Sequence, residues 1–180
     1  MNRLSPDFEL NKYGLHVRYV CENDAEFILG LRTDPILARF LHSTDNDLQK
    51  QKEWIREYKL REARGEDYYF IYSNENDYIG VNRLYNIKDN SATAGSWICK
   101  SDADGMASIL TIIILRDILF DIVGAEYDYF DVRKGNKKVQ RLHEMCGAVI
   151  ESEDELNYYY RLSAKDYRNN KEQILQLIQN

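Results

Sequence analysis

Residues 95–108 of the chain read GSWICKSDADGMAS, and the pattern of side chains changes in the middle of this stretch. A strand predicted over 92–99 ends here, and a strongly apolar helix is predicted over 105–123. The loop between them, 100–104, consists of small and polar residues. Such a loop at the start of a helix offers unpaired backbone N–H groups and the positive end of the helix dipole. The stretch therefore favours a diphosphate site, although an ordinary strand–loop–helix junction has the same pattern.

The segments on either side of this junction predict an α+β domain with a mixed sheet. Upstream, strands are expected over 15–20, 68–72 and 78–85, one helix is expected to bury Phe27, Ile28 and Leu31, a charged helix is expected over 47–62, and turns are expected at Pro35 and 74–77. Downstream, the sequence predicts a strand over 126–132, a helix over 136–145 that ends at Gly147, strands over 148–151 and 156–162, and a closing helix over 171–178. This order of elements excludes a doubly wound parallel sheet.

Length and composition indicate a single domain. The 180 residues fit one domain with a core at about 15–167 and a C-terminal helix at about 168–180. The net charge is −6 and the basic residues are scattered, so no nucleic-acid partner is expected. The most apolar run, 109–122, is interrupted by Arg116 and Asp117 and is too short to cross a bilayer, so no membrane partner is expected.

Cysteine usage and the first residues indicate a cellular compartment. Cys21, Cys99 and Cys146 are odd in number and widely spaced, with no CxxC pair. This spacing predicts neither a disulfide framework nor a zinc site, so no metal is expected. Residues 1–9 are polar and lack the apolar segment of a secretory signal. We therefore expect a cytoplasmic protein with reduced thiols.

A second group of reactive side chains lies at 136–147, which reads NKKVQRLHEMCG. An apolar stripe that includes Cys146 runs along one face of the predicted helix, and His143 lies beside it. A lone histidine in this position is more often a structural side chain than a catalytic one. Because Cys146 lies one helical turn from His143, a nucleophilic cysteine, either Cys146 or Cys99, is an alternative enzymatic interpretation.

With both groups in place, the stretch from about 15 to 167 resembles the GCN5-related N-acetyltransferase (GNAT) family. It looks most like the branch that includes ribosomal-protein N-terminal acetyltransferases and acetyltransferases of nucleotide-linked amino sugars. Gly105 and Ala107 occupy the small-residue positions of the family's phosphate loop, and Asn136, His143 and Gly147 match the spacing of its second motif. Further similar positions are 31–34, Arg39-Phe40, Trp54-Ile55, Ile79-Gly80 and 158–163.

Three residues differ from the family pattern. Asp102 stands at an arginine or glutamine position, His143 at the usual tyrosine and Ala148 at the usual phenylalanine. Asp102 places an acid near the expected phosphates, so an alternative is a degenerate module that binds CoA poorly and does not catalyse. His143 still provides a proton donor, and Ala148 looks like a change in packing.

The resemblance implies a mixed, mostly antiparallel sheet of about seven strands, flanked by helices, with acetyl-CoA in a gap between two splayed parallel strands. Trp97, Ile98 and Cys99 would pair with the pantetheine arm, and the Ile98 N–H would face the thioester oxygen. The backbone N–H groups of Asp104, Gly105, Met106, Ala107 and Ser108 would hold the pyrophosphate. Asn136 would bind the pantetheine or the region of the leaving sulfur.

The reaction implied is direct attack of a neutral amine on the thioester, in which positioning supplies much of the rate. A side chain with a pKa near neutrality moves protons most effectively. His143, with an ordinary pKa of about 6.5, is the predicted acid. Asp131 is the predicted base, with Glu126 and a chain of waters as alternatives.

The acceptor is expected at the opposite mouth of the gap. The predicted substrate ligands are Arg32, Asn82, Arg83 and Tyr85, with Arg39 as a further polar candidate. Guanidinium groups match the phosphate oxygens of a nucleotide diphosphate. This favours a small acceptor whose primary amine belongs to an amino sugar or a nucleotide-linked amino sugar. A protein N-terminus is the alternative acceptor, and surface ion pairs are the alternative role of the arginines. A monomer or homodimer is expected.

Overall fold

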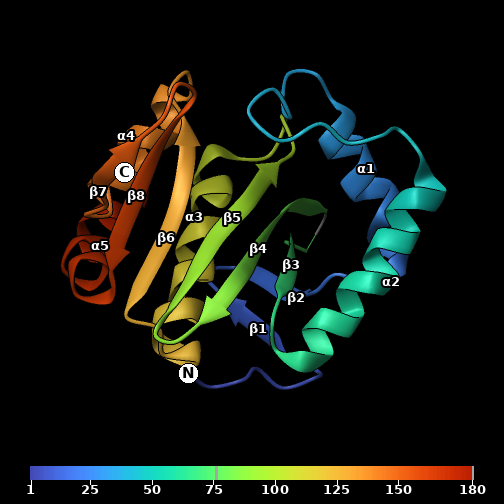
Figure 1. Cartoon of the computed structure of the whole chain (residues 1–180), viewed down its shortest axis with the longest axis horizontal. Helices are drawn as coiled ribbons and strands as arrows, with labels where there is room; N and C mark the ends of the chain where they lie inside the picture. The colour runs from blue at the N-terminus through green and yellow to red at the C-terminus, as the bar shows by residue number, and fades with distance from the viewer. Residues whose placement is uncertain (76, 180) are drawn as a thin grey trace.

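The described residues, 1–75 and 77–179, form one eight-stranded sheet with helices on both faces, as the computed structural model in Figure 1 shows. The strands are β1 (Glu9–Lys12), β2 (Leu15–Tyr19), β3 (Tyr68–Ser73), β4 (Tyr78–Lys88), β5 (Ser91–Cys99), β6 (Tyr127–Arg133), β7 (Val149–Glu153) and β8 (Asn157–Ser163). Their order across the sheet is β1-β2-β3-β4-β5-β6-β8-β7. The predicted α+β class is confirmed.

The sheet is interrupted at its centre, between β5 and β6. This pair is parallel, whereas the other paired strands are antiparallel. The two strands pair only where they begin, with Ser91 opposite Tyr127 and Ala92 opposite Asp128. Beyond these residues they diverge, and Figure 1 shows the space between them widening toward both arrowheads. This is the splayed gap that the resemblance implied.

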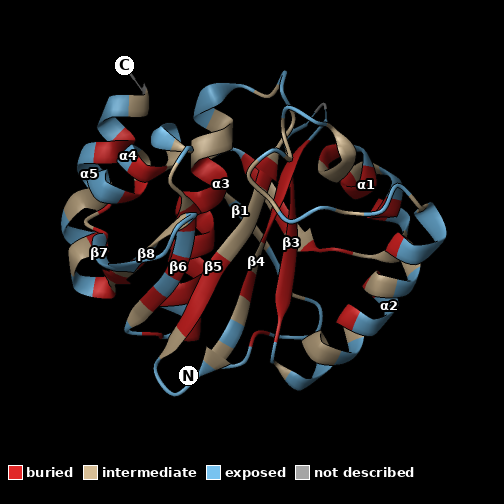
Figure 2. Ribbon diagram, turned by 45° about the horizontal axis from the view of Figure 1, so that its top comes forward, coloured by how far each residue is buried: buried red, intermediate tan, exposed pale blue. Residues whose placement is uncertain are grey.

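Helices cover the two faces of the sheet unequally. They are α1 (Ala25–Thr33), α2 (Leu48–Arg64), α3 (Gly105–Asp117), α4 (Lys137–Met145) and α5 (Ala164–Gln179), with a 3₁₀ turn at Glu22–Asp24 and a π-helical turn at Ile118–Val123. α1 and α2 enclose a small core against β3 and β4, whereas the larger core lies on the opposite face, with α3 and α5. On the side of α1 and α2, no helix of the described residues covers the strands β6, β8 and β7 (Figures 1 and 2).

The uncovered face of β6 and β8 is rich in tyrosine. Phe130 and Tyr160 are buried on the side of α3 and stack with ring centroids 5.4 Å apart. Because neighbouring residues of a strand point to opposite faces, Tyr129 and Tyr159 lie on the other side, where they are 41% and 40% exposed. An exposed aromatic surface therefore borders the gap.

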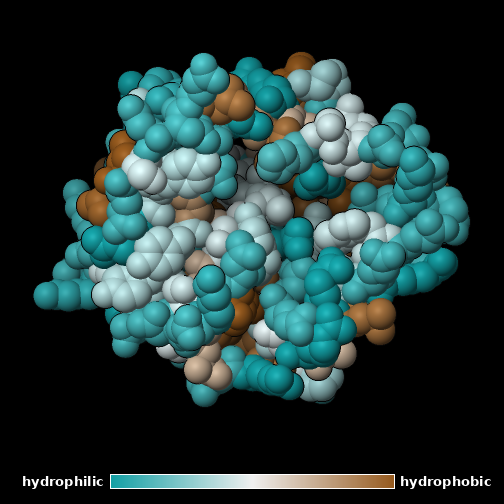
Figure 3. Space-filling model, in the orientation of Figure 1, coloured by the Kyte–Doolittle hydropathy of each residue, from teal (hydrophilic) through white to brown (hydrophobic). Residues whose placement is uncertain are grey.

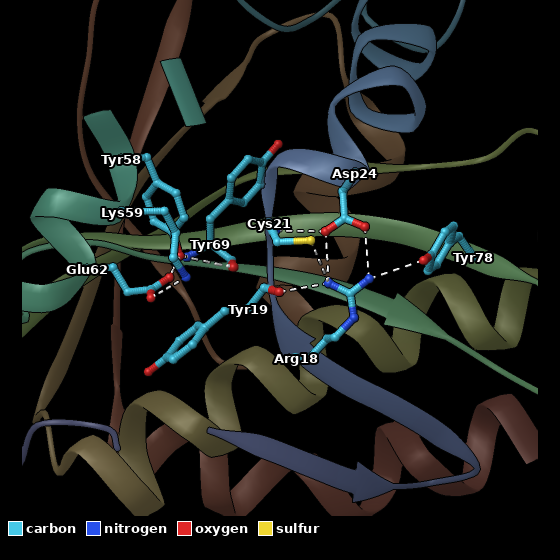
Figure 4. Close-up of polar contacts among 9 residues, drawn as sticks. All are labelled: Arg18, Tyr19, Cys21, Asp24, Tyr58, Lys59, Glu62, Tyr69 and Tyr78. Carbon is cyan, nitrogen blue, oxygen red and sulfur yellow. Dashed lines mark hydrogen bonds and ion pairs between the residues drawn. The ribbon is translucent and has the colours of Figure 1, made fainter. Parts of the chain in front are cut away.

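Polar contacts tie the two helices near the gap to the sheet (Figure 4). Arg18 of β2 donates two hydrogen bonds of 2.8 Å to the Asp24 carboxylate, directly before α1. Tyr58 of α2 accepts a hydrogen bond from the Tyr69 N–H of β3 at 2.9 Å. The wall that α1 and α2 form is thereby held against the strands.

The charged helix predicted over 47–62 is confirmed as α2, and its ends follow local signals. The Asp47 side chain accepts hydrogen bonds from the N–H groups of Gln49 and Lys50, as an N-cap does. Gly65 ends the helix with a φ of 74°, in the left-handed region that favours glycine.

The structure adds one strand to the seven that the sequence predicted. β1 pairs with β2 through a two-residue turn in which Tyr13 and Gly14 have φ values of 52° and 76°. Turns of this type usually carry asparagine, aspartate or glycine at both positions, so Tyr13 concealed the hairpin. The closing helix was also predicted too short, because α5 begins at Ala164 rather than at 171.

Two further predictions concern turns and membranes. The Asn74 N–H donates to the Asp77 carbonyl at 3.0 Å, which closes the predicted turn at 74–77, although Asn76 lies outside the described residues. Within 1–75 and 77–179, no helix is both long enough and apolar enough to cross a membrane.

Candidate active site

A bulge in β5 frees part of its backbone at the edge of the gap. The register between β4 and β5 shifts at Ser96, whose φ is 53°, so that one residue of β4 lies opposite both Ser96 and Trp97. A bulge leaves its extra residue outside the ladder and bends the strand. The backbone around these two residues is thus available beside the gap.

The ladder beyond the bulge directs the Ile98 N–H away from the gap. The Lys100 N–H donates to the Ile79 carbonyl at 2.9 Å, and hydrogen-bonded pairs alternate along an antiparallel ladder. Ile98, two residues earlier, therefore bonds to β4, and the Cys99 N–H points toward β6. The predicted donor, the Ile98 N–H, is thus engaged with β4, and the Cys99 N–H is the neighbouring donor that faces the gap.

A cavity of about 500 Å³ occupies the gap between the diverging strands. Its lining includes the bulge residues Ser96 and Trp97 of β5, Asp131 of β6, and Asn136 and His143 at α4. Figure 3 shows the surface hollowed between the side of α1 and α2 and the side of β6 and β8. The first selected group thus contributes Ser96 and Trp97 to the same cavity as Asn136 and His143, whereas the predicted cofactor-binding residues Ile98, Cys99 and 104–108 do not line it.

A second cavity, of about 460 Å³, adjoins the first on the side of α1 and α2. Arg32, His42 and Tyr85 line both cavities, and Trp54 and Tyr69 line the second one. The two cavities also share Ser96, so together their linings extend from the bulge in β5 to the first helices.

The N-terminus of α3 retains backbone N–H groups without a helical partner. The first intrahelical bond runs from the Ser108 N–H to the Asp104 carbonyl at 2.9 Å, and the Asp104 carboxylate accepts the Met106 N–H at 3.2 Å. The N–H groups of Gly105 and Ala107 therefore remain for a ligand, with the positive end of the helix dipole behind them. Of the five amides predicted to hold the pyrophosphate, those of Met106 and Ser108 are thus occupied within the helix cap.

The acid that departs from the family pattern is turned toward solvent. The side chain of Asp102 is 74% exposed, and its carboxylate lies 3.5 Å from the Lys100 ammonium. Lys100 also pairs with Asp77. Because a cation lies beside it and water surrounds it, Asp102 has only a weak repulsive effect on a nearby phosphate.

Asn136 lies at the start of α4, at the edge of the central cavity. It occupies the N-cap position of α4, but its side chain makes no cap hydrogen bond. Its carbonyl accepts the Gln140 N–H at 3.1 Å, so the backbone begins the helix alone. The carboxamide faces a cavity that it helps to line, and is available to a ligand.

His143 belongs to a buried polar network that the sequence did not predict. Its Nδ1 lies 3.0 Å from an Arg116 NH2 nitrogen, and Arg116 Nε lies 3.2 Å from the Asp128 carboxylate. Asp128 in turn accepts the Ala94 N–H of β5 at 2.9 Å. Burial, and then Arg116, hold the pKa of His143 well below its ordinary value. The predicted near-neutral pKa is therefore wrong, and His143 is a neutral imidazole at pH 7.

Arg116 and Asp128 left signals in the sequence that were not used. Arg116 interrupts the most apolar run of the chain, and Asp128 shares its strand face with the buried Phe130 and Val132. A charge at an inward position implies a buried partner. His42, which also lines the cavities, had no signal beyond its residue type.

Asp131 and Glu126, the two candidate bases, lie in different places. Asp131 is exposed and lines the central cavity, and its carboxylate forms no ion pair or hydrogen bond with a described residue. Burial, and then Asp131, raise the pKa of the adjoining Tyr85 hydroxyl. Glu126 accepts a hydrogen bond from Asn90 at 2.9 Å, where β5 and β6 still pair, away from the cavity lining. The geometry favours Asp131.

The predicted arginines differ in their free charge. Arg83 is bound to Asp67, which also pairs with Arg61, so its charge is compensated inside the protein. Arg32 Nε donates to Thr44 Oγ1 at 2.9 Å, and the described chain offers it no acidic partner. Arg39 lies over the Phe40 ring and lines neither cavity. Of the predicted arginines, Arg32 is therefore the one that lines the cavities without an acidic partner in the described chain.

Asn82 is not placed at the cavity. Its side chain is fully buried on the side of α3, where it accepts a hydrogen bond from the Tyr72 hydroxyl at 2.9 Å and donates to the Thr111 carbonyl at 3.0 Å. Because strand residues alternate between faces, Asn82 points away from Arg83 and Tyr85. The prediction that Asn82 binds substrate is corrected to a structural role.

The chain matches the acetyltransferase (GNAT) domain family over residues 15–149. It belongs to the GNAT family of acetyltransferases. A solved structure described as apo FdhC, a nucleotide-linked sugar GNAT, is 37% identical, with a TM-score of 0.85, over 96% of this chain and 99% of the other. No curated protein matches the chain.

Two further GNAT structures are similar in fold. The ribosomal-protein-S5-alanine acetyltransferase from Vibrio fischeri is 15% identical with a TM-score of 0.76, over 89% of this chain and 99% of that protein. The spermidine N-acetyltransferase from Vibrio cholerae, in complex with CoA and spermine, is 20% identical with a TM-score of 0.74, over 88% and 100% of the two chains.

As a GNAT protein, the chain is an acetyl-CoA-dependent acyltransferase with acetyl-CoA as its co-substrate. The residues present fit this co-substrate: β5 offers backbone at the bulge, and α3 offers the N–H groups of Gly105 and Ala107. In the described part of the GNAT chain, no group of three or more His, Cys, Asp or Glu side chains is arranged to hold a metal ion.

The alternative of a nucleophilic cysteine is not supported in this GNAT domain. Burial raises the thiol pKa of both Cys99 and Cys146, so neither forms a thiolate readily. Cys146 is also fully buried on the apolar side of α4. Direct attack by the amine needs neither thiol.

Proposed function

We propose that the chain transfers acetyl from acetyl-CoA to the primary amine of a nucleotide-linked amino sugar. The observation that carries this proposal is the 37% identity, over 96% of the chain, to a protein described as a nucleotide-linked sugar GNAT. The likenesses to the peptide and polyamine enzymes, at 15% and 20% identity, extend to the fold alone.

The cavity on the side of α1 and α2 supports a phosphorylated acceptor. Arg32 brings an uncompensated guanidinium to the point where both cavities meet. Its planar fork suits the paired oxygens of a diphosphate. Thr44 and His42 lie beside it as further hydrogen-bonding groups. Arg32 would thus anchor the nucleotide end of the acceptor.

The opposite wall supports a ring-shaped substrate that carries an amine. A groove of about 340 Å³ runs along the uncovered face of β6 and β8, where Tyr85, Tyr129 and Tyr159 border Asp131. Flat aromatic rings bind sugar and base rings through their faces, and a lone carboxylate attracts an ammonium group. Asp131 would then hold the amine and accept its proton before the attack.

The chemical step joins the two sides of the gap. The amine nitrogen forms a bond to the acetyl carbon, and the carbon–sulfur bond breaks. Backbone N–H groups at Trp97 or Cys99 would stabilise the negative charge that develops on the carbonyl oxygen. Since the reactants are held side by side, positioning supplies much of the acceleration.

Release of free CoA thiol with a panel of amines tests the proposal. The panel contains a nucleoside-diphosphate-linked amino sugar, the same sugar without the nucleotide, a ribosomal-protein N-terminal peptide and spermidine. We expect the nucleotide-linked sugar to give the highest kcat/KM, by about tenfold or more over the free sugar, because a charge-assisted contact is lost. A peptide as the best acceptor would overturn the proposal, and acetyl-CoA binding without turnover would indicate a degenerate module.

A further inference from the structure

His143 faces two environments at once, and its ring nitrogens are distinct. Nδ1 lies 3.0 Å from the Arg116 guanidinium in the core. Nε2 has no hydrogen-bond partner in the described chain. The fully buried side-chain atoms without a partner among the described residues are one nitrogen of Arg116 and one oxygen of Asn157. Nε2 is not one of them, so it is not fully enclosed. Because His143 lines the central cavity, Nε2 is the edge of the ring that meets this space.

We propose that Arg116 fixes His143 as the neutral imidazole that carries its proton on Nε2, so that this N–H hydrogen-bonds the thioester sulfur and the departing thiolate without protonating them. Arg116 is then a positioning residue that acts through His143. The donor and acceptor roles of Arg116 and His143 decide which ring nitrogen of His143 carries the proton. A guanidinium only donates and is never deprotonated in proteins, so Nδ1 must accept and the proton must be on Nε2.

The surroundings of His143 oppose a second proton on the ring. Arg116 from α3 brings a full positive charge, and its Asp128 partner on β6 is already bound to Arg116 and to the Ala94 N–H. The remaining neighbours are uncharged: Trp97 from β5 and Phe130 from β6, the latter with its ring centroid 4.5 Å from that of His143. The other titratable groups nearby are Cys146 and Tyr167, packed around Arg116, and Asp131, across the same cavity. None of these gives a protonated imidazole a contacting acid.

The network also connects the parts of the site that must stay in register. Arg116 belongs to α3, Asp128 to β6, Ala94 to β5 and His143 to α4. Asp128 accepts a hydrogen bond from the backbone of β5 only two residues before the bulge. The same contacts that set the tautomer of His143 therefore place its Nε2 relative to the backbone that receives acetyl-CoA. Arg116 keeps one guanidinium nitrogen buried without a partner, which a purely structural core residue would avoid.

The transfer step balances without a proton from His143. The amine nitrogen bonds to the acetyl carbon, the carbon–sulfur bond breaks, and its electron pair stays on sulfur. The Nε2–H stabilises this charge by a hydrogen bond and retains its proton. The thiolate takes a proton from solvent as CoA leaves, and the second amine proton passes to solvent, because Asp131 already holds the first one. The tautomer rests on geometry alone, whereas the role at sulfur rests on the proposed acetyl transfer.

Nitrogen-15 NMR of histidine-labelled wild-type protein tests the tautomer directly, without any substrate. The chain has 3 histidines, so the His143 ring is assigned by the signals that His143→Gln removes. We expect Nε2 to be protonated and Nδ1 unprotonated, with no change from about pH 5 to pH 8, while free histidine added to the sample titrates near 6.5. A proton on Nδ1, or a cationic His143 ring within that range, would overturn the proposal.

Variants of Arg116 test its positioning role. In Arg116→Gln we expect the tautomer preference of His143 to weaken, and kcat to fall about tenfold while KM for acetyl-CoA changes by about twofold or less. Arg116→Lys, which still donates to Nδ1, should restore the Nε2–H tautomer in part. Arg168→Gln, at an exposed arginine paired with Asp121, is the control. An unchanged tautomer in Arg116→Gln would remove Arg116 from this role. Should the Arg116 variants fail to fold, the wild-type spectrum still decides the tautomer.

Discussion

The two sides of the gap in the sheet treat charge in opposite ways. On the side of α3, Arg116, Asp128 and His143 are buried and connected by hydrogen bonds. On the side of α1 and α2, Arg32 and Asp131 face open cavities and have no ionic partner in the described chain. We call the side with Arg116, Asp128 and His143 the dry side, and the side with Arg32 and Asp131 the open side. The dry side is held together by hydrogen bonds within the protein, which suits the thioester because acetyl-CoA is the same in every turnover. The open side leaves its charges for an acceptor to compensate.

The largest effect should come from removing the acid of the dry side. Asp128→Asn keeps the shape of the side chain and can still accept the Ala94 N–H, but it leaves Arg116 as an uncompensated buried charge. We expect the free energy of unfolding in urea to fall by about 3–5 kcal/mol. Asp121→Asn, in an exposed ion pair with Arg168, should cost about 1 kcal/mol or less. Equal losses in the two variants would contradict the contrast between the two sides.

The second effect follows from the depressed pKa of His143. Below a pH of about 6.5 the unfolded chain binds a proton at this residue that the folded chain refuses. Stability is therefore lost as the pH falls, at up to about 1.4 kcal/mol per pH unit, and the contribution is absent above that pH. The wild-type unfolding free energy should thus decline more steeply than that of His143→Gln between about pH 6 and pH 5. Parallel curves over that interval would show that folded His143 takes up the proton.

The open side was easier to predict from the sequence than the dry side. Arg32 and Tyr85 appeared as candidates because polar side chains near an expected mouth are conspicuous, and both line the cavities. Asn136 and His143 were selected because their spacing matches the second motif of the GNAT family. The partners of His143 were missed because residues 116 and 128 lie on different elements, and only the fold brings them together. The sequence analysis placed Asn82 at the substrate site for a related reason. Strand alternation and the bulge in β5 decide which residues of β4 face the cavity, and composition does not reveal either one.

Most elements of the fold were also predictable, and the exceptions have local causes. The periodic segments α3, α4 and β6 followed their patterns, because each has an apolar face that packs on the core. β1 was missed because a polar hairpin at the sheet edge contributes few buried side chains. The Ile98 N–H was misassigned because ladder phase depends on pairing with β4, which composition does not reveal.

A third measurement sharpens the role of the open side. Arg32→Gln should raise KM for the nucleotide-linked amino sugar about tenfold, because it removes a charge-assisted contact to phosphate. The KM for acetyl-CoA should stay the same. Arg32→Lys should recover part of the loss, since it restores the charge without the planar fork. Arg64→Gln, on an exposed arginine paired with Glu66, is the matched control. An unchanged acceptor KM in Arg32→Gln would place the phosphates elsewhere.

The smallest effect concerns Asp102, which lies in the loop directly before α3, next to the predicted phosphate site. Asp102→Asn removes an acid near the free N–H groups of α3 and should lower KM for acetyl-CoA by about two- to threefold at low salt. The effect is small because the carboxylate is 74% exposed and lies 3.5 Å from the Lys100 ammonium. Added salt should remove it, because mobile ions screen exposed charges. Asp121→Asn, outside the phosphate loop, should leave this KM unchanged. A large gain in affinity for acetyl-CoA that persists at high salt would contradict this expectation, because it would mean that Asp102 contacts the phosphates directly. The phosphate loop would then hold its charge away from solvent, as the dry side does.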